Sequence, residues 1–217
     1  MRTFGFPEFL YILEAAKWTL ALSLIAFIGG AILGLAIALA RTSDSKTARA
    51  VSTGFIQIFQ GTPLLLQLFL IFFGAPVLGM DINPWVAAGL ALILNSAAFL
   101  GEIWRGCIEA IPRGQWEAAE ALNLDYSARM RDIVLPQAFK IALPPTVGYV
   151  VQIIKGTSLA AIIGFTEITR AGQIINNATF QPLYVFTTVA AIYFVICWPL
   201  SLMAAHMERK RARALAR

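Results

Sequence analysis

Long apolar runs without a charged residue constrain this chain more than any other feature. A transmembrane helix needs about 20 consecutive, mostly apolar residues, and four runs reach that length: residues 18–40, 50–80, 82–101 and 171–207. A fifth run, 141–166, is interrupted only by Lys155, whose insertion cost of about 2.5–3.5 kcal/mol is outweighed by its Ile, Val and Leu neighbours. The composition agrees, because 59% of the residues are hydrophobic and 13% are charged, against about 45–50% and 25% in globular domains. We therefore expect an all-α polytopic membrane bundle of about five transmembrane helices, forming one domain over residues 1–217.

The basic residues predict how these spans are oriented. If the amino terminus lies outside, the cytoplasmic segments hold Arg41, Lys46, Arg49, Arg105, Arg113, Arg129, Arg131, Lys140, Arg209, Lys210, Arg211, Arg213 and Arg217. Only Arg2, Lys17 and Arg170 then remain outside. Because cytoplasmic loops carry an excess of Lys and Arg, we expect an external amino terminus and a cytoplasmic carboxyl terminus. The net charge of +5 is thus a topology signal, and the basic tail is an interfacial anchor, with no nucleic-acid partner.

Residues that commonly do chemistry are scarce. Cys107 and Cys197 fall near a predicted helix end and inside a span, so we expect both to be packing residues, and His206 lies beside the basic tail. A metal site needs more ligands than these provide. No histidine falls in the interior of a span, since His206 stands at the end of its run, and no paired carboxylates accompany a nucleophile. We therefore expect no metal site and no catalytic residues, which argues against an intramembrane enzyme.

The first half of the chain has a ridge of small residues in the run 18–40 and an interruption in the run 50–80. Ala26, Gly30, Gly34 and Ala38 recur at four-residue intervals, a small-residue ridge that lets another helix approach closely. The run 50–80 is longer than one span, and Gly61-Thr62-Pro63 interrupts it, because proline removes a backbone donor. We expect residues 51–60 to lie along or shallowly in the cytoplasmic interface, with the crossing beginning near Pro63.

Polar residues within the apolar runs are candidates for a substrate path. Gln152, Lys155 and Ser158 fall within about 120° of a helix circumference, Asn95 and Ser96 lie in the third span, and Gln57 stands near the break. An ionisable residue at membrane depth faces a partner or water. For Lys155 two interpretations stay open: a structural ion pair or snorkelling to the outer surface, or a cation facing a translocation cavity. Likewise Gln57, Gln60 and Thr62 either line a cavity or satisfy the backbone groups freed by Pro63.

The segment between the runs 82–101 and 141–166, residues 105–140, holds charges of both signs and is expected to be cytoplasmic. Residues 115–122 are mainly good helix formers, and their alanines leave a face with little side-chain bulk. Asn123 suits a left-handed helix stop. Asp125 suits the N-cap of a second short helix, with Arg129 placed for an ion pair with it. Such a helix-turn-helix, ending at Leu135-Pro136, is either a lever moved by a partner or a structural cap on the bundle.

These residues resemble the signature of the integral membrane subunits of ABC-type importers. That signature is Glu-Ala-Ala, three residues, Gly, nine residues, Ile, one residue, Leu-Pro, and the chain carries Glu117, Ala118, Ala119, Asn123, Ile133, Leu135 and Pro136 at those spacings. It departs at Asn123, where the family has Gly, a change that a left-handed turn tolerates.

Further segments resemble the polar amino acid permeases, the histidine/glutamine-type group. They are Gly61-Thr62-Pro63-Leu64-Leu65, Arg105-Gly106, Ile111-Pro112-Arg113-Gly114-Gln115, Leu135-Pro136-Gln137-Ala138 and Lys155-Gly156-Thr157-Ser158-Leu159. An Arg often precedes Gly-Thr-Pro in that group, whereas this chain has Gln60. The resemblance covers about residues 13–211, with the coupling loop at about 112–136.

The resemblance implies a permease subunit of an ATP-driven importer, in a bacterial cytoplasmic (inner) membrane, that moves a polar or charged amino acid by alternating access. Implied partners are a second permease subunit, identical or similar, two cytoplasmic ATPase subunits and an extracytoplasmic solute-binding protein. The chain has no Gly-rich phosphate loop of the Walker type, so ATP and Mg²⁺ are expected on the ATPase, with no cofactor in this chain. The alternative is an ATP-independent secondary transporter or channel, which predicts paired intramembrane charges and no use for a docking loop.

Overall fold

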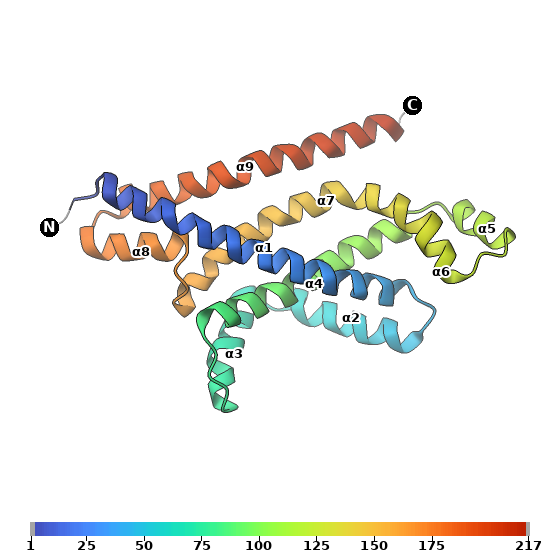
Figure 1. Cartoon of the computed structure of the whole chain (residues 1–217), viewed down its shortest axis with the longest axis horizontal. Helices are drawn as coiled ribbons and strands as arrows, with labels where there is room; N and C mark the ends of the chain where they lie inside the picture. Colours follow the sequence, from blue (N-terminus) through green and yellow to red (C-terminus); the bar gives the residue numbers. More distant parts are fainter. Residues whose placement is uncertain (1–2, 216–217) are drawn as a thin grey trace.

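The computed structural model describes residues 3–215 and confirms an all-helical membrane bundle (Figure 1). Its helices are α1 (Phe6–Thr42), α2 (Lys46–Gly61), α3 (Leu64–Val77), α4 (Pro84–Glu109), α5 (Arg113–Ala121), α6 (Tyr126–Ala128), the π-helix η1 (Arg129–Val134), α7 (Leu135–Gly156), the 3₁₀-helix η2 (Thr157–Ile163), α8 (Ile168–Thr179) and α9 (Pro182–Leu215). No strand occurs among these residues.

The pair α1 and α4 forms the centre of the bundle, and the predicted small-residue ridge holds it together. Ala26, Gly30, Gly34 and Ala38 are all buried on α1. A Cβ added to Gly30 would lie 2.5 Å from the Cβ of Ser96 on α4. The two backbones approach each other so closely because glycine has no side chain at the crossing.

The second predicted span is a bent pair of helices. Four helices of the described chain are each long and apolar enough to cross a membrane, and α2 with α3 makes a fifth candidate, bent by 99° at its break. The prediction that residues 51–60 lie in the interface is wrong: α2 packs along α1 and α4, while α3 turns out of the bundle (Figure 1). The α2 packing is fixed by burial of Ser52 and Ile56 and by a hydrogen bond from Arg41 to Thr53.

The second half departs from the predicted boundaries in two places. The predicted run 141–166 is part of a longer helical segment, because α7 already begins at Leu135, continues from α6 and η1 without a turn, and contains Pro144 and Pro145. The predicted span 171–207 is divided, because Phe180 adopts a left-handed φ of 54° after α8. With 12 residues, α8 is too short to span a bilayer, and it lies beside the first turns of α1 at the end of the bundle where the chain begins (Figure 1).

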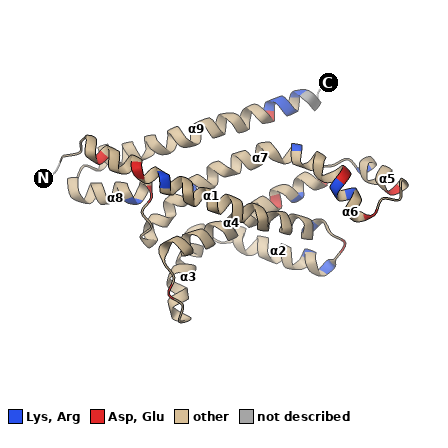
Figure 2. Ribbon diagram, in the orientation of Figure 1, with Lys and Arg blue, Asp and Glu red and all other residues tan. Residues whose placement is uncertain are grey.

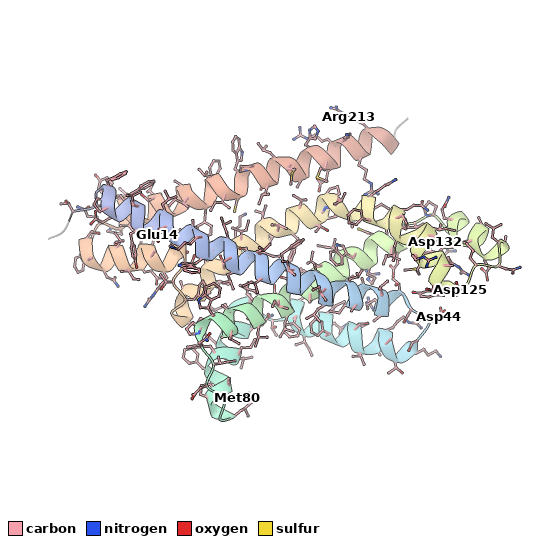
Figure 3. The ribbon with its side chains drawn as sticks, in the orientation of Figure 1. Glu14, Asp44, Met80, Asp125, Asp132 and Arg213 are labelled. Atoms are coloured by element: carbon pink, nitrogen blue, oxygen red, sulfur yellow. The ribbon has the colours of Figure 1, made fainter. Side chains whose placement is uncertain are left out.

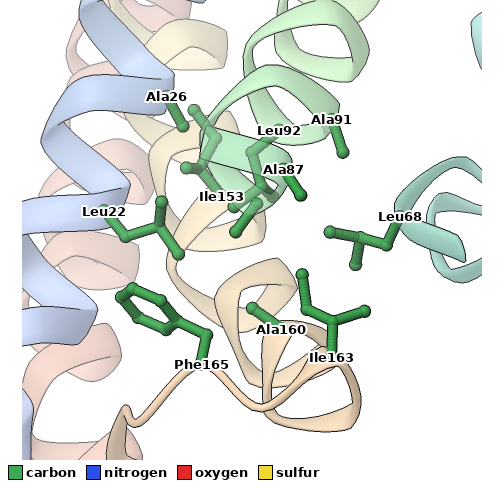
Figure 4. Packing of buried hydrophobic residues seen from close by; sticks show 11 residues of the cluster. Leu22, Ala26, Leu68, Ala87, Ala91, Leu92, Ile153, Ala160, Ile163 and Phe165 are labelled. Carbon is green, nitrogen blue, oxygen red and sulfur yellow. The ribbon is translucent and has the colours of Figure 1, made fainter. Parts of the chain in front are cut away.

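The core lies where α1, α4, α7 and η2 converge. Leu22, Leu92, Ile153 and Phe165 are buried there with small alanines from α4 and η2 (Figure 4). Cys107 and Cys197 are buried free thiols on α4 and α9. The core therefore consists of long-range contacts between segments that are far apart in sequence.

The charged residues gather at the ends of the bundle. Basic residues mark the last turns of α9 and the start of α2 (Figure 2). Asp44, Asp125, Asp132 and Arg213 lie toward one end, and Glu14 lies toward the other (Figure 3). The middle of the bundle carries few charged residues (Figure 2), as a hydrocarbon environment requires.

Candidate functional site

A cavity of about 620 Å³ opens between the end of α2, the middle of α4, the end of α7 and η2. The predicted substrate-path residues Asn95, Ser96, Gln152, Lys155 and Ser158 all line it. The break between α2 and α3, the helix α4 and the segment of α7 and η2 are far apart in sequence, and all contribute to this one site. Such a cavity, mainly apolar with a few convergent polar groups, has the make-up of a small-molecule site.

The sixth candidate, Gln57, is not part of the cavity. It is exposed on α2, one turn before the residues that line the cavity from this helix, Gln60 and Thr62. Its placement near the break was correctly predicted. Its place in the substrate path was not, because the residues that line the cavity at the break are Gln60, Thr62 and Leu64.

Asn95 is held on both sides by residues that the sequence analysis missed. Its Nδ2 donates to Oε1 of Gln67 at 3.2 Å, and its Oδ1 accepts from the Tyr149 hydroxyl at 3.4 Å. The Tyr149 ring stacks on Phe99, with centroids 5.4 Å apart. An isolated glutamine four residues after Pro63 in an apolar run was the available signal for Gln67.

Gln67 also satisfies backbone carbonyl groups that are left without a helical partner at the break before Pro63. It is buried on α3, and its Nε2 donates to the carbonyls of Phe59 at 2.8 Å and Thr62 at 3.0 Å. The Thr62 hydroxyl donates to the carbonyl of Ile58 at 2.7 Å. Thr62 therefore both satisfies the backbone and lines the cavity.

Lys155 is exposed to this cavity and forms no ion pair within the described part of the chain. The predicted alternative of an ion pair inside the subunit therefore lacks a partner carboxylate here. Lys155 is also the one Lys or Arg among the cavity-lining residues. The cavity accordingly presents an ammonium beside amide and hydroxyl groups, a set that can bind a carboxylate.

The second candidate site is the loop between α4 and α7. Asn123 has the predicted left-handed conformation, with a φ of 53°. The N–H of Asn123 donates to the carbonyl of Glu120, and that of Leu124 donates to Ala119. This is a Schellman ending. Asp125 caps the next turn as predicted, accepting from the N–H of Ala128 at 2.9 Å.

Other features of the loop differ from the prediction. Arg129 donates to the carbonyl of Leu124 at 3.3 Å instead of pairing with Asp125. Glu117 and Ala118 are exposed, whereas Ala119 is fully buried, because α5 packs this side against η1. Ala119 therefore cannot form part of the small contact face that the sequence suggested, and within Glu117-Ala118-Ala119 the first two residues are the accessible ones.

The inner side of the loop between α4 and α7 packs against the bundle. Met130 and Val134 of η1 are buried with Ile108 and Ile111 beneath α5. Ile133 and Leu135 are half-buried and Pro136 is exposed. Gln137 of α7 donates to Gln115 of α5 at 3.1 Å. A force on α5 would consequently reach both α4 and α7.

A buried carboxyl group at the opposite end was also missed. Glu167 is fully buried at the N-terminus of α8, where its Oε1 accepts from the N–H of Arg170 at 2.9 Å and its Oε2 accepts from the Tyr193 hydroxyl at 2.6 Å. These bonds join α8 to α9. The available sequence signal was the position of Glu167 as a possible N-cap directly before an amphipathic helical segment.

Residues 30–213 match the sequence profile of the family described as binding-protein-dependent transport system inner membrane component. The chain belongs to this family. It is therefore a membrane component of a transport system and not an enzyme in itself, and the resemblance drawn from the loop motif is confirmed.

Relatives in this family transport amino acids. The L-cystine transport system permease protein TcyB of Bacillus subtilis is 37% identical over 201 residues, covering 92% of this chain and 86% of the relative. The glutamine transport system permease protein GlnP of Escherichia coli is 36% identical over 206 residues, covering 94% of each. Among solved structures, a crystal structure of an amino acid ABC transporter with histidines matches with a TM-score of 0.87 and 34% identity, covering 96% of this chain and 100% of that one.

Proposed function

We propose that this permease subunit forms half of the translocation path of an ATP-driven importer for a polar or charged amino acid. The observation that carries the proposal is the cavity between α2, α4, α7 and η2, where Lys155, without an ion-pair partner among the described residues, lies beside Asn95 and Gln152. A substrate carboxylate needs compensation in a low-dielectric passage. The Lys155 ammonium supplies it, while amide oxygens accept from the substrate ammonium group.

The cavity changes its access by relative movement of the helices that line it. It is bounded by α2, α4, α7 and η2, and the coupling loop joins the C-terminal end of α4 to the N-terminal end of α7. In this proposal a partner that pulls on α5 tilts α4 and α7 and opens the cavity to one side or the other. That is alternating access, with the loop as the lever.

The complex has partners on three sides. One of the two cytoplasmic ATPases docks on Glu117 and Ala118 of this subunit, and the ATPases bind ATP and Mg²⁺, since the chain itself has no Walker sequence. A second permease subunit completes the cavity from the other half. An extracytoplasmic solute-binding protein delivers the amino acid at the end where the chain begins and where α8 lies. The external amino terminus follows from the distribution of Lys and Arg.

Reconstitution tests the proposal. The subunit, its partner permease and the ATPase are placed in proteoliposomes, and uptake of radiolabelled amino acids is measured with and without the ATPase, Mg-ATP and the binding protein. We expect saturable uptake only with all components present. Uptake driven by an ion gradient in the absence of the ATPase would establish the alternative, a secondary transporter or channel.

A further inference from the structure

An apolar groove on the side of the bundle is separate from the substrate cavity. It has a volume of about 560 Å³ and lies between α1, α4 and α7, with Phe27, Leu35, Trp104, Ala138 and Ala142 among its walls. Trp104 donates its indole N–H to the Thr146 hydroxyl at 2.9 Å, so the polar groups of this wall satisfy each other. The groove therefore offers an occupant almost only apolar surface.

The dimensions of the groove fit one leaflet of a bilayer. Its α7 wall runs from Leu135 to Thr146, about 16 Å at 1.5 Å per residue. Half of a hydrocarbon core of roughly 30 Å is about the same length. Phe139 on this wall is 64% exposed, so the groove opens at the surface of the subunit.

A cation stands beside the groove. Arg211 of α9 donates to the carbonyl of Ile141 at 3.3 Å, next to the groove residue Ala142. Arg209, Lys210 and Arg213 extend the positive charge along the same helix end (Figure 2). An occupant with an apolar chain and an anionic head would satisfy both parts of this surface.

We propose that the groove binds one anionic phospholipid of the cytoplasmic leaflet, with an acyl chain along α1 and α7 and its phosphate at Arg211. A zwitterionic lipid can place its chain there but gains less from the basic helix end. The bound lipid would stabilise the position of α9, whose last turns contact α7 near Ile141.

The test uses the intact transporter in nanodiscs with phosphatidylglycerol that carries a photoreactive group on its acyl chain. Cross-links are mapped by mass spectrometry of peptides. We expect labelling on the α7 segment 138–146 and on the α4 peptide that contains Cys107. Unlabelled phosphatidylglycerol should compete better than phosphatidylcholine by about fivefold, the effect of roughly one basic side chain at a membrane surface.

Matched variants locate the occupant. Ala142→Phe and Ala31→Phe fill the groove from opposite walls and should abolish the labelling, while Ala190→Phe on an exposed position of α9 should preserve it. Arg211→Gln should remove the preference for phosphatidylglycerol, and Arg213→Gln, about 200° around the helix, should keep it. ATPase activity of each assembled complex verifies its fold.

Three results would overturn the proposal. Equal labelling of wild type and both groove-filling variants would show only ordinary surrounding lipid. No headgroup preference in wild type would remove the role of Arg211. Disulfide cross-linking between groove cysteines introduced in two permease subunits would show that the second subunit covers this face instead.

Discussion

Lys155 decides the electrostatics of the cavity at the residue scale. A hydrogen bond to a charged group is worth about 1.5–3 kcal/mol, so Lys155→Met should raise the KM for uptake by roughly tenfold or more. Lys155→Arg should restore much of the affinity. Lys140→Met is the matched control, since Lys140 is exposed on the same helix outside the cavity. Unchanged uptake kinetics in an assembled Lys155→Met complex would show that this charge is not part of the substrate path.

Asn123 tests the local backbone of the loop. Because its φ is 53°, Asn123→Gly should be tolerated or slightly stabilising, whereas Asn123→Val should cost about 1–2 kcal/mol or more from strain at a left-handed position. Thermal unfolding of the purified subunit in detergent measures both. Equal stability of the two variants would mean that the turn does not depend on residue 123.

At the scale of helices, the crossing of α1 and α4 depends on glycine. Gly30→Ala would place a Cβ 2.5 Å from that of Ser96, and overpacking of this kind costs about 1–3 kcal/mol. Gly54 of α2 has no atom within 4 Å of the equivalent position, so Gly54→Ala should leave stability unchanged or raise it by up to about 1 kcal/mol. Melting temperatures compare the pair, and a stabilising Gly30→Ala would contradict the close packing.

The outer face of α5 is the element that we expect to meet the ATPase. Ala118→Arg should leave the subunit folded and inserted but reduce ATPase binding and ATP-driven uptake by roughly tenfold or more, as for a central interface position. Ala119→Arg is unsuitable, because Ala119 is fully buried and the change would disrupt the loop itself. Ala212→Arg, on an exposed turn of α9, is the control for an added charge. Full ATP-driven uptake by Ala118→Arg would refute this docking face.

At the scale of the whole molecule, the membrane topology can be measured by labelling, which shows the side of the membrane on which each end of the bundle lies. Asp44 lies exposed at one end of the bundle, and Ala178 is exposed on α8 at the other (Figures 1 and 3). In a Cys107→Ala, Cys197→Ala background, an impermeant maleimide added to intact spheroplasts should label Ala178→Cys but not Asp44→Cys. Lysis should expose Asp44→Cys. The reverse pattern would place the amino terminus in the cytoplasm.

The sequence alone was sufficient for properties that depend on neighbouring residues. Apolar run length determined the helical membrane class, because hydrocarbon requires each spanning segment to satisfy its own backbone. The small ridge of α1 and the left-handed Asn123 were also correctly predicted, since both follow from side-chain size and local backbone sterics.

Only the tertiary structure decided which polar residues meet. Gln67 of α3 meets Asn95 of α4, Gln57 lies outside the cavity, and packing on η1 buries Ala119. These outcomes depend on the rotation and tilt of whole helices, which are set by contacts between distant segments such as Gly30 with Ser96. A sequence pattern shows which residues share one face of a helix. It does not show which other helix that face contacts, because this is decided only when the helices pack.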